Sequence, residues 1–131
     1  MLLVDQSIGI YVIDDIYSIR KKMEKAIKSY AYEGDGEYGK YNDDSLMLID
    51  TTTLFKNAEN GLYLTYSKLY CKGILLKRFV IHLSDIQSIH FDKGGASKLS
   101  INGKEVLYVP QENLKGSMMN LVNALKTYIE Q

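Results

Sequence analysis

Short runs of alternating apolar and polar residues fill the second half of the chain, as in β-strands with one buried and one partly exposed face. The clearest runs cover residues 62–66, 79–83 and 106–109. Asn102-Gly103 lies between strand-like residues and predicts a type I′ hairpin, because both turn positions then require positive φ. Residues 113–131 instead show the periodicity of a helix with one broad apolar face. This order predicts a mainly-β fold with a C-terminal helix.

An amphipathic pattern also occupies the N-terminal part of the chain. Its apolar residues recur every three or four positions, at Ile16, Ile19, Met23, Ile27 and Tyr30. We expect a helix that Asp14 or Asp15 caps and that the glycines at 34 and 36 end, since glycine accepts the left-handed conformation of helix C-termini. Residues 8–13 fit either a short strand or an apolar lead-in to this helix, and the pattern does not separate the two.

Three sequence segments carry a resemblance to a known family. They are LFKNAENGLYLT at residues 54–65, KLYCK at 68–72 and FVIHLSDIQSI at 79–89, and the C-terminal helix follows them. Over residues 46–131 the chain resembles bacterial pleckstrin-homology-like (PH-like) domains. The resemblance implies a bent antiparallel barrel or sandwich of about seven strands, with the helix filling one open end. It also implies binding of proteins, peptides or lipid head groups, and no enzymatic activity.

The length of 131 residues predicts one domain with an α+β, mainly β, fold. Within this domain, residues 1–45 hold the N-terminal helix and an acidic loop rich in glycine and tyrosine. Residues 46–131 hold the PH-like β-barrel and the C-terminal helix. Cys71 is the only cysteine and the first 15 residues lack the features of a secretory signal, so we expect a cytoplasmic protein.

Charge is balanced overall and segregated along the chain. Sixteen basic and sixteen acidic residues give a net charge of zero, which predicts no nucleic-acid partner and no stable membrane association. Residues 31–60 hold seven carboxylates against two lysines, and residues 61–104 hold seven basic residues against two carboxylates. Two interpretations remain open. The two segments pair or are simply solvated, or the acidic segment faces a basic partner.

The residues that could carry chemistry do not form a recognisable catalytic or metal site. Cys71, His82 and His90 are the ingredients of a thiol nucleophile with its base, but strand alternation gives no reason for them to converge. A strand cysteine is usually a small buried apolar residue. The two histidines lack helix-borne ligand spacing, and the acidic loop lacks the EF-hand ligand pattern. We therefore predict no enzyme, no metal and no cofactor.

The acidic loop, residues 34–45, is the candidate partner-binding site. Tyrosines within an acidic, glycine-rich loop are typical anchors for a protein partner. The candidate residues are Asp35, Glu37, Tyr38, Tyr41, Asp43 and Asp44. A partner could also bind at a strand edge or in a groove between helix and strand.

These observations favour a non-enzymatic module that binds a protein partner. One alternative is a small inhibitor, either a toxin-neutralising immunity protein or a phage anti-defence protein, whose acidic segment covers a basic active site. Binding of lipid head groups is a weaker alternative. It needs clustered cations at the first hairpin, where Lys56 stands beside Glu59.

Overall fold

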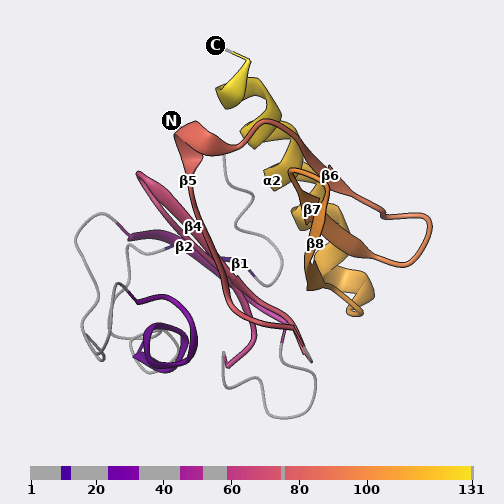
Figure 1. Ribbon diagram of the computed structural model, residues 1–131. Coiled ribbons are helices and arrows are strands. Elements are labelled where there is room, and N and C mark those ends of the chain that lie inside the picture. Colours follow the sequence, from indigo (N-terminus) through magenta and orange to yellow (C-terminus); the bar gives the residue numbers. More distant parts are fainter. Residues whose placement is uncertain (1–9, 13–23, 33–44, 52–58, 75, 131) are drawn as a thin grey trace.

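The computed structural model describes residues 10–12, 24–32, 45–51, 59–74 and 76–130. These residues form two antiparallel β-sheets, a long C-terminal helix and a short stretch of helix near the N-terminus (Figure 1). The predicted α+β, mainly β, fold is therefore confirmed. No helix within the described ranges is long and apolar enough to cross a membrane.

The larger sheet has five strands in the order β1-β2-β3-β4-β5, and each neighbouring pair is antiparallel. The strands are β1 (Ile10–Val12), β2 (Ser45–Asp50), β3 (Gly61–Thr65), β4 (Lys68–Lys72) and β5 (Phe79–His82). Strand β1 settles the ambiguity over residues 8–13, because part of that segment pairs with β2. Strand β3 starts at a glycine with φ 151°, where any Cβ would overlap the carbonyl oxygen of Ile49.

The smaller sheet has three strands in the order β6-β7-β8, namely β6 (Ile89–Phe91), β7 (Lys98–Ile101) and β8 (Lys104–Tyr108). A single turn of 3-10 helix, η1 (Leu83–Asp85), lies between β5 and β6 in the chain. The predicted hairpin is confirmed, since Asn102 has φ 51° and Gly103 has φ 79°. No strand pairing joins the two sheets among the described residues, so they form a sandwich and not a closed barrel.

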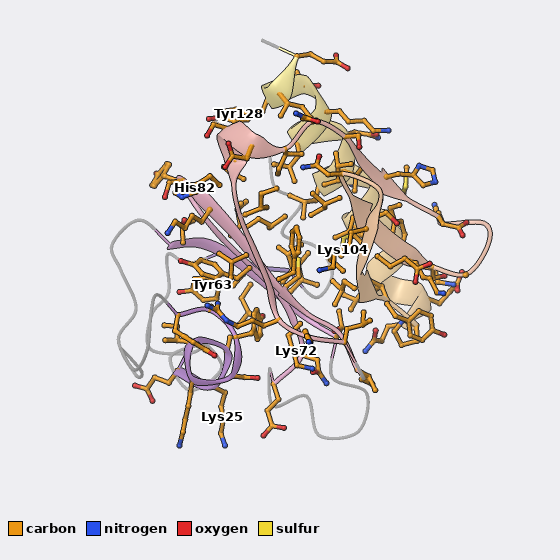
Figure 2. The ribbon with its side chains drawn as sticks, viewed as in Figure 1. Lys25, Tyr63, Lys72, His82, Lys104 and Tyr128 are labelled. Carbon is orange, nitrogen blue, oxygen red and sulfur yellow. The ribbon has the colours of Figure 1, made fainter. Side chains whose placement is uncertain are left out.

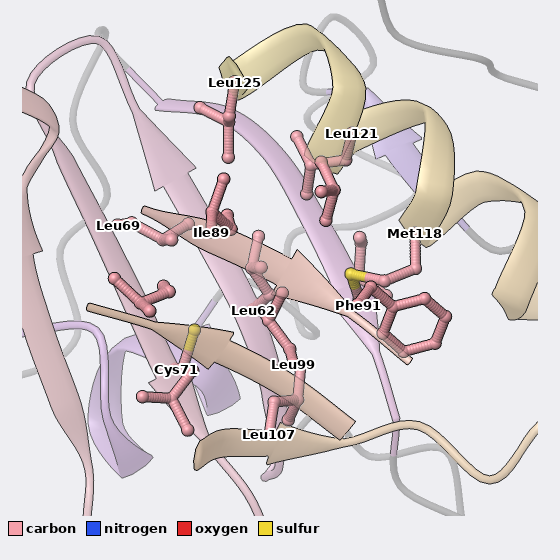
Figure 3. Close-up of a cluster of buried hydrophobic side chains, with 14 of the residues drawn as sticks. Leu62, Leu69, Cys71, Ile89, Phe91, Leu99, Leu107, Met118, Leu121 and Leu125 are labelled. Atoms are coloured by element: carbon pink, nitrogen blue, oxygen red, sulfur yellow. The ribbon is translucent and has the colours of Figure 1, made fainter. Parts of the chain in front are cut away.

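The main core fills the space between the two sheets and the C-terminal helix, α2 (Glu112–Ile129). Met118, Leu121 and Leu125 of α2 point toward side chains of both sheets (Figure 3). The helix lies beside β6 (Figure 1), and its range agrees with the helix predicted over residues 113–131.

A second apolar cluster covers the opposite face of the five-stranded sheet. The N-terminal helix, described over residues 24–29, and the residues directly after it pack there. The cluster contains Ala26, Ile27, Tyr30, Ala31, Leu48, Tyr63 and Tyr70. Tyr63 and Tyr70 pair across β3 and β4, with ring centres 6.4 Å apart in an edge-to-face arrangement.

This second cluster changes the environment of β3. Alternation along residues 62–66 predicted one buried and one partly exposed face, but every residue of β3 is buried. The prediction was wrong because Tyr63, which it left partly exposed, packs against the N-terminal helix. Tyr63 is only 2% exposed, although a tyrosine at a solvent-facing strand position would show much of its ring.

Candidate functional site

The six residues predicted as partner contacts lie outside the described residues. They are Asp35, Glu37, Tyr38, Tyr41, Asp43 and Asp44, and their role stays a prediction. The structure does describe the segment that leads toward them. One guanidinium nitrogen of Arg78 donates to the carbonyl oxygens of Tyr30 at 3.0 Å and Tyr32 at 3.1 Å. The same guanidinium lies 4.0 Å from the centre of the Tyr32 ring.

Arg78 directly precedes β5 and therefore joins the start of this strand to the residues that follow the N-terminal helix. Carbonyl oxygens at a helix C-terminus lack partners within the helix, and a guanidinium offers several donors in a fixed plane. Arg78 donates to two carbonyls of the residues directly after the helix and stacks on an aromatic ring at the same time. The contact fixes the start of β5 relative to the helix that covers the sheet.

Strand β5 forms one edge of the five-stranded sheet. It pairs with β4 along its whole length, with Tyr70 opposite Val80 and Leu69 opposite Ile81. No described residue pairs with β5 on its other side. An edge strand presents unpaired backbone N–H and C=O groups, which can pair with another extended chain.

The composition of β5 leaves this edge open to pairing. Proteins usually protect edges with lysine, proline, a bulge or a covering element. Phe79, Val80 and Ile81 are strand-forming residues that are neither fully buried nor fully exposed, and the β4–β5 register has no shift. Only His82, at the end of the strand, is exposed.

The other three edges differ from β5. Strand β1 is only three residues long. Strand β6 lies against α2 (Figure 1). Strand β8 begins with the exposed charged residues Lys104 and Glu105, and its pairing with β7 shifts register between Leu99 and Ser100. Among the described strands, β5 is thus the edge that combines apolar side chains with a regular backbone.

Basic residues lie near this edge. The sequence from Gly61 to Ser84 contains no aspartate or glutamate, and it contains Lys68, Lys72, Lys77 and Arg78. Lys104 adds a further cation, because its Nζ lies 5.6 Å from the centre of the Phe79 ring. Figure 2 shows Lys104 reaching from β8 toward the five-stranded sheet, and His82 at the other end of β5.

The structure keeps the candidate catalytic residues apart. Cys71 is fully buried in the main core, and this burial raises the pKa of its thiol far above the usual range. It is therefore the buried apolar residue that its strand position predicted, and its thiol stays protonated and unreactive. His82 and His90 are both exposed and belong to different sheets. No group of three or more metal-binding side chains gathers in the described part of the chain.

A shallow hollow lies beyond the end of β5. Its volume is about 380 Å³, and its walls are Leu83, Ser84, Ile86, Tyr128 and Ile129. Tyr128, from the last turn of α2, is 44% exposed. The hollow is open to solvent and offers two hydroxyl groups, so it can take a side chain of a partner but holds no constellation for chemistry.

No family model matches the chain, and comparisons with curated proteins and with solved structures likewise give no match. Sequence patterns placed a strand at residues 79–83 but gave no sign that it forms a sheet edge. The absence of carboxylates between Gly61 and Ser84 was visible in the sequence and marks the same region.

Proposed function

We propose that this chain is a non-enzymatic, cytoplasmic binding module of PH-like fold, and that it engages a protein partner through the free edge of β5. The observation that carries the proposal is the edge itself. Strand β5 is regular and apolar, and no described residue pairs with its outer side. The single cysteine, buried and unpaired, supports a reducing compartment.

An extended segment of the partner would add to the sheet as a further strand. Its backbone would pair with the unpaired groups of β5, and such hydrogen bonds contribute about 0.5–1.5 kcal/mol each. Side chains of β5 alternate between the two sheet faces, so the segment would contact Phe79 and Ile81 on one face and Val80 and His82 on the other. Backbone pairing would supply affinity, and these side chains would supply selectivity.

Site-specific photo-crosslinking tests this assignment. His82 and His90 are both exposed strand residues, but His82 belongs to β5 and His90 to the other sheet. A photo-reactive amino acid at position 82 should capture a protein partner in cells, and the same amino acid at position 90 should not. Equal capture at both positions, or capture at position 90 alone, would refute binding at the β5 edge.

A further inference from the structure

We infer that the segment bound at β5 is acidic. The inference rests on the proposed function and adds the chemistry of the partner to it. Pairing along a strand edge requires a peptide backbone, which lipids and nucleic acids do not have, so the occupant is a protein segment. Its sequence preference is set by the charges and side chains around β5.

The stretch of chain that forms β5 and the two strands before it carries charges of one sign. A continuous stretch from Gly61 to Ser84 forms β3, β4, β5 and their connections without a single carboxylate. Two of its cations interact with neutral groups, since Arg78 donates to backbone carbonyls and Lys72 Nζ donates to the carbonyl oxygen of Gly73 at 2.8 Å. Carbonyl groups do not cancel a positive charge. A segment placed on β5 therefore meets the positive charges of the neighbouring strand β4 and of the two residues that precede β5.

The second sheet adds to this potential. Lys104 contacts the Phe79 ring from β8, which places an ammonium group at the start of β5. Its neighbour Glu105 is bound by Lys98, with Nζ 3.2 Å from a carboxylate oxygen. Among the described residues, no carboxylate forms an ion pair with Lys104 or Lys77. Both cations lie near the N-terminal end of β5, next to Arg78.

Self-pairing through β5 fits this surface less well. Two copies joined at their β5 edges would bring together two stretches that each carry four cations and no carboxylate. Juxtaposed like charges oppose association, whereas an acidic segment gains from the same potential. A segment with a strand-forming apolar core and flanking carboxylates would match both the apolar centre of β5 and the cations near it.

Selection from a display library of random twelve-residue peptides against the full chain tests the inference. Enriched peptides should combine a short run of β-branched or aromatic residues with flanking aspartate or glutamate. A selected peptide should bind the K77E/K104E variant about tenfold more weakly, because each charge reversal removes an attraction and adds a repulsion. The milder K77Q/K104Q variant removes the two charges without reversing them. Its loss of affinity should be about half as large as the tenfold loss on a logarithmic scale.

Lys93→Glu is the matched control. Lys93 is exposed in the connection between β6 and β7, so the substitution lowers the net charge by two units, as K77Q/K104Q does, but away from β5. Affinity should be unchanged in this variant. A loss as large as that of K77Q/K104Q would show a response to net charge alone and would overturn the inference.

The outcomes also separate the inference from the proposed function. Peptides that protect the amides of β5 but lack acidic residues, or bind K77E/K104E normally, would overturn the acidic preference and leave edge binding intact. Selected peptides that leave the β5 amides unprotected would overturn both. A concentration-dependent dimer with protected β5 amides, seen by analytical ultracentrifugation and hydrogen exchange, would replace the acidic segment with a second copy.

Discussion

Asn102 forms the tight turn between β7 and β8 and also holds the chain between η1 and β6. Its side-chain oxygen accepts the backbone N–H groups of Gln87 at 2.7 Å and Ser88 at 3.0 Å. Its side-chain nitrogen donates to the carbonyl oxygen of Asp85 at 3.1 Å, and its own N–H donates to the carbonyl oxygen of Ser88 at 2.9 Å. One residue thus fixes the route by which the chain enters the smaller sheet.

The Asn102→Gly variant isolates the side chain of this residue. Glycine keeps the positive φ that the turn requires and removes the three side-chain hydrogen bonds. We expect the free energy of unfolding to fall by about 1–3 kcal/mol, because two backbone donors and one acceptor lose their partners. Urea denaturation measures the change. Asn102→Gly with wild-type stability would show that these contacts contribute nothing.

The turn itself was predictable from the sequence, and the contacts of Asn102 were not. The hairpin follows from two adjacent residues that tolerate positive φ, which is a local property. The partners of the side chain lie 14 to 17 residues earlier in the chain. Such pairing depends on how the sheet and η1 are placed in space, and no local pattern encodes it.

At the scale of elements, the N-terminal helix buries one face of the five-stranded sheet. Its amphipathic pattern was clear in the sequence, but the surface that receives its apolar face was not. Ala26 and Ile27 pack on the face that carries Tyr63 and Tyr70. The alternating pattern gave the wrong exposure for β3, because tyrosine suits either a solvent-facing position or a buried one. Arg78 then links this helix to β5.

The Arg78→Ala variant tests this link. Loss of two charge-assisted hydrogen bonds and of the stacked Tyr32 ring should lower the free energy of unfolding by about 2 kcal/mol. Amide exchange should accelerate in residues 24–32 and stay unchanged in α2. Lys77→Ala is the control, because Lys77 is an exposed neighbouring cation. If both variants behave alike, Arg78 does not hold the helix in place.

At the scale of the whole molecule, the two faces of the larger sheet have different neighbours. One face contributes to the core shared with the smaller sheet and α2, and the N-terminal helix covers the other face. With both faces covered, the sheet can extend only at its edges. The described strands leave β5 as the regular apolar edge, and the surrounding cations give that edge a preferred type of partner.

The class of fold was accessible from the sequence because strand alternation, the Asn-Gly turn and the C-terminal helix are all encoded locally. The candidate site was accessible only in part. Sequence reasoning favoured the acidic loop, and it named a strand edge without identifying which strand. The order of strands in a sheet arises from pairings between distant segments, such as β2 with β3 and β4 with β5. Those pairings make β5 an edge.

Residue-resolved amide hydrogen exchange tests the β5 edge most directly. In the free chain, every second amide of residues 79–82 should exchange rapidly, because antiparallel pairing with β4 engages only alternate N–H groups. A saturating acidic peptide from the selection should slow those rapid amides by about tenfold or more. The amides of β7, which is paired on both sides, should stay slow throughout. Unchanged β5 amides in a saturated complex, with new protection elsewhere, would contradict binding at this edge.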